Sequence, residues 1–495
     1  MPALLDWARR AWARLAALPV LSQDGLLYLA AAALAAGIIA MAVTADYREW
    51  AEMAIGPYLA AAAASWLVQR RRNRLEGGSG QAPRAGSTPG RWGDPVRATT
   101  ALLVLVFAVL LPLGYQLVWR ADSLAGAHAQ PEVAVIERAG DRAAHGRDPY
   151  LSSPTSVGAS PSSDSRAVDA STFFPYLPGM AVFGLTNVAT GSPEIDDARV
   201  VLTLFTLLVA FLALILVRAP PERRWRAFQF LVVLPSGALP LVTGGDDLPV
   251  LALMLLALVL AQRRQPVWSG LVIGVASTLK FTAWGLLVLL ALAEYDRSGR
   301  RAWGRYLCAA AAVAVPVVAF GIALGPHAFL TNVIEFPLGL TKVNSPAASP
   351  LPGQVLVTLL PHLKRSLTIL LVAFGLGAVL AGWWRWRPAS PAAVARFTGL
   401  AIILAIVVAP ATRFGYFIYP ANLLVWSVLV AGGSRPAVAA AGCPSAGVTD
   451  LVDGHHYLAR RRVAPATERR RERRVHIHDL NRDTPCVTVV PVLLR

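Results

Sequence analysis

Apolar residues occur in long blocks along most of the chain, and short runs rich in arginine separate these blocks. An α-helix needs roughly 20 apolar residues to cross the hydrocarbon core of a bilayer, and most of the blocks are near that length. They cover residues 25–45, 51–68, 98–119, 200–217, 228–242, 248–261, 267–293, 303–324, 366–384, 397–411 and 414–431. The pattern therefore predicts an all-α polytopic membrane protein with about 11 to 13 transmembrane helices.

One block, residues 267–293, has arginines on both sides, at 263–264 and from 297 onward. Basic loops tend to stay on the cytosolic side of a membrane, so a single crossing would place one of these clusters outside. We therefore expect two short helices that turn around at residues 280–282. One long, tilted helix is the alternative.

The arginine clusters also orient the rest of the chain. Arg9, Arg10 and Arg14 precede the first span, and a run of arginines at 70–74 follows the second. Both termini are therefore expected to be cytosolic, and the long polar stretch 120–199 is expected to lie outside. High arginine and alanine usage is typical of a GC-rich, perhaps actinobacterial, genome, so we expect a multi-pass protein of the bacterial cytoplasmic (inner) membrane.

Changes of composition divide the chain into four parts. Residues 1–72 form an N-terminal segment with a transmembrane hairpin, and residues 73–97 form a flexible cytosolic linker rich in Gly, Ser, Pro and Arg. Residues 98–431 form the main membrane domain. Residues 432–495 have no spanning block and contain arginine runs, so we expect a basic, mostly disordered cytosolic tail.

Composition narrows the possible functions. With 55% hydrophobic and only 15% charged residues, the chain is not a disordered protein. Its formal net charge of +17 sits mainly between apolar blocks, where it orients the helices, so it does not indicate a nucleic-acid partner. The cysteines and histidines have no zinc spacing, and the chain has no glycine-rich nucleotide loop. No motif of these kinds indicates a metal or a cofactor.

The outer stretch begins with a sequence typical of an amphipathic helix at 131–146. Pro131 suits the first helical position, Val133 and Ile136 share one face, and Gly146 is a plausible stop. Glu132 then falls in the first turn, where the helix dipole stabilises a carboxylate. A simple helix-capping role for Glu132 is the alternative.

Several segments together resemble a known enzyme family. The stretch 132–150 has an acidic residue followed by a Gly-x-x-x-Tyr segment that ends at Tyr150, an aromatic and proline-rich segment follows at 173–178, and Lys280 follows a glycine-containing apolar run. In this order they resemble the polyprenol-phosphate-mannose-dependent mannosyltransferases of glycosyltransferase family 87, also described as DUF2029-like, in the GT-C superfamily. The resemblance spans about residues 98–431. It implies a GT-C-like helix bundle with a large extracytoplasmic loop after the third span.

The resemblance also implies a reaction: inverting transfer of a hexose, with mannose as the expected sugar, from a polyprenyl phosphate to a lipid or glycan acceptor at the outer face. Glu132 takes the place of the family's acidic residue and is the candidate general base. The family commonly has Asp there and Tyr a few residues later, where this chain has Ile136. Glu137 and Asp141 are therefore kept as alternative bases.

Cations are needed to hold the donor phosphate, and Lys280 is the first candidate because a charged residue inside the membrane is costly. The chain has only three lysines. Lys342 and Arg413, both in outer segments, are further candidates. The alternatives are snorkelling for Lys280, a surface role for Lys342 and anchoring of a helix end for Arg413.

Four further residues are candidates for contacts with the substrate, namely Tyr150, Tyr176, Asp246 and Asp247. The two aspartates form an outer turn between short apolar helices, where they could hold sugar hydroxyls or a divalent ion, or merely keep the turn in water. Two other functions stay open from the sequence alone. They are a membrane transporter or lipid flippase, for which inverted repeats would be expected, and a non-catalytic GT-C-like protein.

Overall fold

A computed structural model describes residue 10 and residues 13–41, 44–79, 93–123, 128–150, 172–188, 191–192, 194–341, 343 and 347–431. The chain divides into two compact units, residues 1–434 and 435–495, and everything described here belongs to the first. The predicted cytosolic tail at 432–495 lies outside the described residues, as does most of the predicted linker.

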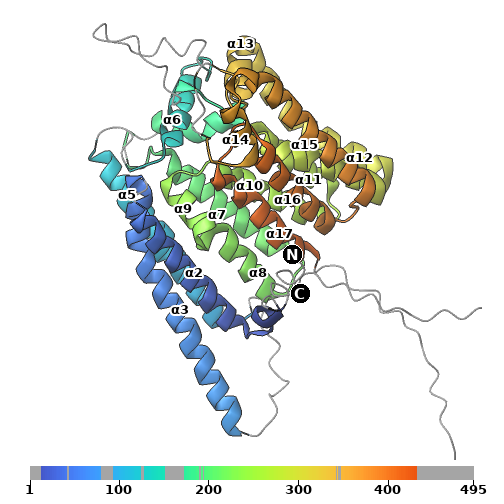
Figure 1. Cartoon of the computed structure of the whole chain (residues 1–495). Helices are drawn as coiled ribbons and strands as arrows, with labels where there is room; N and C mark the ends of the chain where they lie inside the picture. The colour runs from blue at the N-terminus through green and yellow to red at the C-terminus, as the bar shows by residue number, and fades with distance from the viewer. Residues whose placement is uncertain are drawn as a thin grey trace, which may run out of the picture. The chain divides into compact units, whose positions relative to one another are not determined.

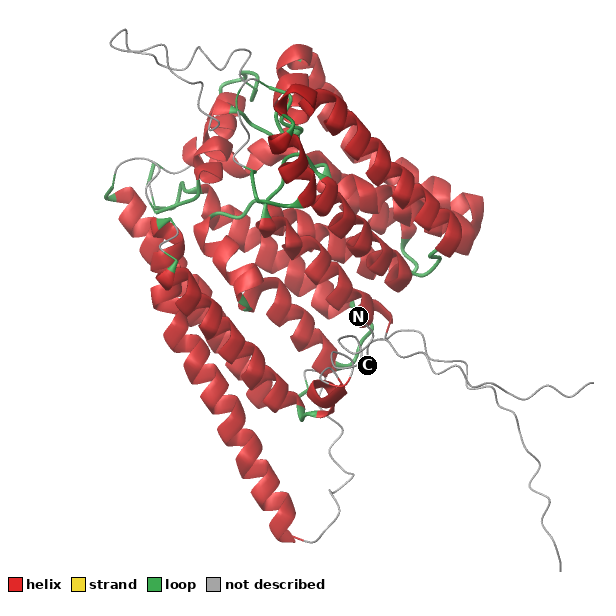
Figure 2. Cartoon of the chain, in the orientation of Figure 1, coloured by secondary structure: helices red, strands yellow, loops and turns green. Residues whose placement is uncertain are grey.

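The described residues form helices and turns without a β-strand (Figure 2). In chain order the α-helices are α2 (Val20–Ala40), α3 (Ala45–Ser79), α4 (Pro95–Leu105), α5 (Leu111–Ala121), α6 (Pro131–Ala144), α7 (Ala198–Leu216), α8 (Pro221–Phe228), α9 (Pro235–Thr243), α10 (Asp247–Gln262), α11 (Pro266–Leu279), α12 (Thr282–Leu324), α13 (Pro326–Phe329), α14 (Pro352–Leu359), α15 (Lys364–Trp386), α16 (Pro391–Val408) and α17 (Ile418–Ala431). Short 3-10 and π segments link them, the longest being η4 (Pro178–Val188). Figure 1 shows the helices with the same labels.

Within the described part of the chain, 9 helical stretches are long and apolar enough to cross a membrane, and α10 and α11 are shorter apolar helices. The longest stretch, α12, contains a turn at Gly299, whose φ is 77°. The Tyr306 hydroxyl donates to the Leu287 carbonyl oxygen across this turn at 3.0 Å, so the two halves of α12 run back along each other. When the two halves of α12 are counted separately and α10 and α11 are included, the number of possible crossings falls in the predicted range. The all-α, multi-pass architecture is confirmed.

The chain turns around where the arginine pattern predicts it. Helix α11 ends at Leu279 and α12 begins at Thr282, so residues 267–293 form two helices rather than one tilted span. At the far ends of these helices, the charges of Arg264 and Arg297 are close enough to interact. Both arginine clusters thus lie at one end of the bundle, as the prediction requires.

The helix after the second span is longer than the sequence suggested. Helix α3 continues through Ser79, although a flexible linker was expected from residue 73. The sequence from 70 to 76 consists mostly of Arg, Leu, Glu and Asn, and arginine, leucine and glutamate are good helix formers. The chain is helical again from Pro95, where the Asp94 side chain accepts a hydrogen bond from the Val96 amide and caps α4. A linker can therefore occupy only the residues between these helices.

Candidate active site

Helix α6 lies where the sequence predicts it, and two glycines let it pack closely on η4. A Cβ atom added at Gly140 would lie 2.1 Å from the backbone of Gly184, and one added at Gly184 would lie 2.0 Å from the Ile136 carbonyl oxygen. Only a hydrogen side chain fits at either position. The apolar face of α6, including Val133 and Ile136, is fully buried, so the first turn of the helix is held in a fixed position.

The first turn of α6 carries Glu132, and its carboxylate is paired with Arg413. The Arg413 Nη1 donates to Glu132 Oε1 at 2.5 Å, and the two side chains are 36% and 17% exposed. Burial opposes the charge of Arg413, but the carboxylate of Glu132 outweighs it and raises the pKa of the guanidinium. The Thr412 amide donates to the Ala347 carbonyl oxygen at 2.8 Å, which ties the segment carrying Arg413 to the loop before α14.

A second ion cluster centres on Lys280, at the break between α11 and α12. Its Nζ donates to Asp246 Oδ2 at 2.7 Å and to Asp247 Oδ1 at 2.5 Å. The two carboxylates stabilise the positive charge of this lysine, whose side chain is 13% exposed. Burial raises the pKa of Asp246, to about 6, although Lys280 counteracts this. Lys280 is therefore charged, and Asp246 can change its charge near neutral pH.

Aromatic side chains enclose the lysine. The Nζ of Lys280 lies 5.2 Å from the centre of the Tyr176 ring and 5.7 Å from that of Tyr416. The hydroxyl of Tyr419 donates to Asp247 Oδ1 at 2.7 Å. Contacts between a cation and aromatic faces stabilise the charge in a site largely shielded from water.

The two ion clusters belong to one site. The charge of Glu132 acts on both Asp246 and Tyr176, and Tyr416 interacts with both Lys280 and Arg413. The site thus brings together the start of α6, the turn before α10, the break after α11 and the segment before α17. These segments are far apart in the sequence, and all of them are predicted to lie at the outer ends of the helices. Loops gather around α6 at this end of the bundle (Figure 2).

The structure places Tyr150, a predicted substrate contact, behind this site rather than in it. Tyr150 is 1% exposed, and its hydroxyl donates to the Tyr176 carbonyl oxygen at 2.9 Å. Its ring packs against Phe174 and Phe329. In this structure Tyr150 therefore supports the backbone that carries Tyr176.

The alternative bases have other surroundings. Glu137 is buried, its carboxylate accepts from both terminal nitrogens of Arg120 at 2.7 and 2.6 Å, and it also accepts from the Ala198 amide. Asp141 is exposed and lies 3.4 Å from the ring nitrogen of His145. Within the described part of the chain, neither residue contacts Lys280, Asp246 or Asp247. Lys342 lies outside the described residues.

Sequence reasoning did not single out Tyr416 and Tyr419 as site residues. They occur in an aromatic run after Arg413, which is also typical of residues that anchor a helix end at the membrane interface. The sequence pattern also did not reveal the buried network of Arg120, Asp197 and Arg199, in which Asp197 contacts both arginines. In the sequence, the adjacent acidic residues at 196–197 just before an apolar block were the available signal.

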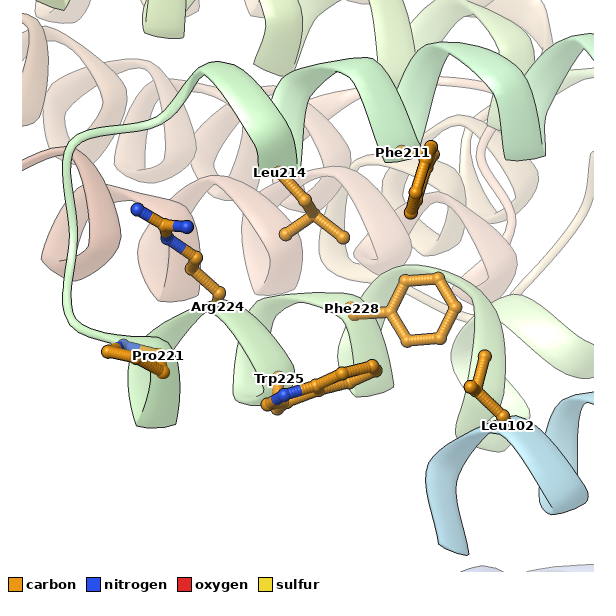
Figure 3. A pocket seen from close by; sticks show the side chains of 7 residues that line it. All are labelled: Leu102, Phe211, Leu214, Pro221, Arg224, Trp225 and Phe228. Carbon is orange, nitrogen blue, oxygen red and sulfur yellow. The ribbon is translucent and has the colours of Figure 1, made fainter. Parts of the chain in front are cut away.

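The described residues contain no group of three or more His, Cys, Asp or Glu residues placed to hold a metal ion. A small apolar pocket lies between α4, α7 and α8, lined by Leu102, Phe211, Leu214, Pro221, Arg224, Trp225 and Phe228 (Figure 3). The guanidinium of Arg224 donates to the backbone carbonyls of Ala219 and Val217. None of the predicted site residues lines this pocket.

The fold and the ion clusters define a multi-pass, all-helical membrane protein with a polar site at one end of its helices. Residues 174–410 match the model of glycosyltransferase family 87. The match confirms the resemblance found in the sequence and supports a membrane glycosyltransferase. The matched region includes the Lys280 cluster and leaves out α6 and the N-terminal hairpin of α2 and α3.

Among solved structures, the chain is similar to ArnT from Cupriavidus metallidurans in the apo state, with 18% sequence identity and a TM-score of 0.40. The likeness covers 67% of this chain and 60% of that chain, so this protein spans less than two thirds of the ArnT length. No curated protein matches the chain.

Proposed function

We propose that the protein transfers a hexose, with mannose as the first candidate, from a polyprenyl phosphate to a lipid or glycan acceptor at the extracytoplasmic face of the bacterial cytoplasmic membrane. The observation that carries this proposal is the meeting of Glu132 and Lys280 in one site. A carboxylate and a cation at the ends of membrane helices suit a reaction that removes a proton from an acceptor and releases a lipid phosphate.

In the proposed reaction, Glu132 is the general base. An acceptor hydroxyl attacks the anomeric carbon of the sugar, the new bond forms between the acceptor oxygen and that carbon, and the bond from the carbon to the phosphate oxygen breaks. The proton of the hydroxyl passes to Glu132, and polyprenyl phosphate leaves with the bonding electron pair. Because a phosphate is a good leaving group, no general acid is required, and a single displacement inverts the anomeric centre.

Arg413 is proposed to serve both the base and the phosphate. A guanidinium has five N–H donors, and one Nη1 contact to Glu132 leaves other donors for a phosphate oxygen. The pair also holds the carboxylate of Glu132 in one orientation before the substrate binds. A phosphate that draws the guanidinium toward itself would weaken this ion pair and make Glu132 a stronger hydrogen-bond acceptor for the hydroxyl.

Lys280 is proposed as the main ligand of the donor phosphate. In this structure Lys280 is paired with the carboxylates of Asp246 and Asp247. An arriving phosphate would compete with these carboxylates for the lysine, and it would add negative charge beside Asp246. Because the pKa of Asp246 is already raised to about 6, added negative charge would favour its protonation. Donor binding is therefore expected to be coupled to the uptake of a proton by Asp246.

The remaining candidates are assigned to the sugar and the lipid phosphate. Tyr176 and Asp247 border the lysine and offer an aromatic face and carboxylate oxygens to sugar hydroxyls. Tyr150 acts on this site through the backbone of Tyr176. Lys342 is kept as a further phosphate ligand on the basis of its position in the outer loop.

The proposal is tested by measuring sugar transfer from synthetic polyprenyl-phosphate-mannose in membranes that contain the wild type or Glu132→Gln. Loss of a general base costs roughly 10²- to 10⁴-fold in rate, so Glu132→Gln is expected to lose activity by that factor. Glu52→Gln is the matched control, because Glu52 forms only an exposed ion pair with Arg48 on α3. If Glu137→Gln abolished transfer while Glu132→Gln kept it, the base would be assigned one helical turn too early.

A further inference from the structure

The N-terminal hairpin of α2 and α3 precedes the region that matches the family, yet it is packed into the body of the protein. Trp50 and Tyr58 on α3 are fully buried. The Trp50 indole donates to the Ala108 carbonyl oxygen at 3.0 Å, and the Tyr58 hydroxyl donates to that of Val233 at 2.7 Å. Figure 1 shows α2 and α3 side by side along the bundle. The hairpin is therefore fixed by specific polar contacts as well as by apolar packing.

At the end near the site, the first turn of α3 contacts the elements that lead to α6. The Asp46 carbonyl oxygen accepts from the Gln116 side-chain amide at 2.7 Å. The Glu49 carboxylate lies 2.7 Å from Nδ1 of His128, in the segment just before α6. These contacts fix the start of α3 relative to α5 and to the chain that enters α6.

Tyr47 forms the most direct connection to the site. Its hydroxyl accepts a hydrogen bond from Nε2 of Gln130 at 2.8 Å, and the same amide donates to Thr243 Oγ1 at 2.8 Å. The backbone of Gln130 is bound as well, because its amide donates to the Thr243 carbonyl oxygen at 2.8 Å and its carbonyl accepts from Val133 at 3.0 Å. Gln130 is the residue that starts α6, and Glu132 follows two positions later.

Tyr47 is also close to the reacting groups themselves. Its phenol interacts electrostatically with both Glu132 and Arg413. The residue that holds Gln130 thus lies within electrostatic reach of the ion pair that carries the proposed base.

We propose that the start of α3 borders the active site and that Tyr47 is a positioning residue, which sets the place of Glu132 through Gln130. This inference rests on the role of Glu132 in the proposed function. A base must lie within hydrogen-bond reach of the hydroxyl it deprotonates, and a displacement of about 1 Å can cost on the order of 100-fold in rate. Loss of the Tyr47 hydroxyl leaves one of the two hydrogen bonds of the Gln130 amide unmade and loosens the start of α6.

The test compares Tyr47→Phe with Tyr28→Phe in the full-length protein. Tyr28 is a matched control because it lies in the same hairpin and its hydroxyl likewise accepts from a glutamine amide, that of Gln229, at 3.0 Å. It lies beside Asp24 and Arg97, away from Glu132. Two quantities are measured, namely kcat and KM for polyprenyl-phosphate-mannose, and the hydrogen exchange of backbone amides in residues 133–136.

Tyr47→Phe is expected to lower kcat about tenfold or more, with the donor KM unchanged within about twofold, because the donor phosphate contacts are intact. Amides at 133–136 are expected to exchange faster than in the wild type. Tyr28→Phe is expected to leave both quantities at the wild-type values.

Wild-type values for Tyr47→Phe would overturn the inference. Equal effects of Tyr47→Phe and Tyr28→Phe would also overturn it, because the hairpin would then act only on the general stability of the protein. The exchange measurement keeps this test separate from the proposed function. If the wild type transferred no sugar, the proposed function would fail, and the exchange at 133–136 would still decide whether Tyr47 holds α6.

Discussion

Charged side chains in this site are paired so that none is left alone in a membrane protein, where an unpaired charge is costly. The two cations differ in their surroundings. Lys280 is 13% exposed and held by two carboxylates, whereas Arg413 is 36% exposed and has one carboxylate partner. Arg413 is thus the more accessible cation, and Lys280 is the one whose availability depends on the charge of its neighbours.

The donor affinity should therefore depend on pH through Asp246. Burial raises the pKa of this carboxyl to about 6, so it is charged above that pH and neutral below it. A phosphodiester keeps one negative charge across this range. We expect the donor KM to fall as the pH is lowered from about 7.5 to about 5.5, because protonation of Asp246 leaves Lys280 with one carboxylate instead of two.

Initial-rate measurements across this pH range check the expectation, with Asp246→Asn as the comparison. The variant should have a low donor KM that changes little with pH, because it imitates the protonated state. A donor KM that rises on acidification in the wild type would contradict the assigned role of Asp246, as would the same pH dependence in the variant.

At the scale of single elements, α6 depends on its two glycine contacts. Because a Cβ at Gly184 would lie 2.0 Å from the Ile136 carbonyl oxygen, Gly184→Ala must push α6 and η4 apart. Overpacking of this kind costs about 1–3 kcal/mol of folding free energy. We expect Gly184→Ala to lower the thermal midpoint and to reduce transfer activity, because the displaced helix carries Glu132.

Gly114→Ala is the matched control for this substitution. Gly114 lies inside α5, and a Cβ added there meets no atom within 4 Å. Alanine favours a helix over glycine, so the control should be neutral or slightly stabilising. Thermal unfolding in detergent and the transfer assay measure both effects. A Gly184→Ala variant as stable and active as Gly114→Ala would show that close packing of α6 on η4 is not required.

The sequence pattern predicted the helices better than their ends. Apolar blocks located the spans, and the arginine clusters on both sides of residues 267–293 revealed the turn at Lys280. The extension of α3 to Ser79 was missed because the residues after the second span have no hydrophobic periodicity. Without such a periodicity, a polar helix and a flexible linker look alike in the sequence. Boundaries depend on local contacts, such as the Asp94 cap of α4, that a hydrophobicity pattern does not contain.

The candidate site was predicted only in part, because local patterns do not contain its contacts either. Lys280 could be named because an intramembrane cation is rare, and Glu132 because the stretch 132–150 resembles the motif of a known family. Their partners could not be named, since the pairing of Glu132 with Arg413 joins residues that are 281 positions apart. The contact of Tyr419 with Asp247 spans 172 positions and is equally invisible to local patterns.

At the scale of the whole described unit, ion pairs gather in two separate groups at the two ends of the bundle. The candidate site lies at one end. Other ion pairs join the helix ends that the arginine pattern places in the cytosol, such as Arg72 with Asp94 at 2.6 Å and Arg97 with Asp24 at 2.6 Å. Which of these two ends faces outward stays a prediction from the basic loops.

Reporter fusions test which end faces outward. A periplasmic-type reporter fused after Asp169 should be active, and one fused after Arg264 should be inactive, because Asp169 belongs to the predicted outer loop and Arg264 to a basic loop. A reporter that is active only in the cytosol should give the reverse result at both positions. Swapped results would place the candidate site at the cytosolic face and contradict the proposed extracytoplasmic reaction.

The most direct test of the central claim is a donor comparison with the purified protein in proteoliposomes. Radiolabelled mannose is supplied either as polyprenyl-phosphate-mannose or as a nucleotide sugar, with a membrane extract as the source of acceptor, and the label in the product is counted. We predict transfer from the lipid-linked donor alone, with release of polyprenyl phosphate, and its loss in Glu132→Gln. Transfer from the nucleotide sugar in the absence of a lipid-linked donor would contradict the account.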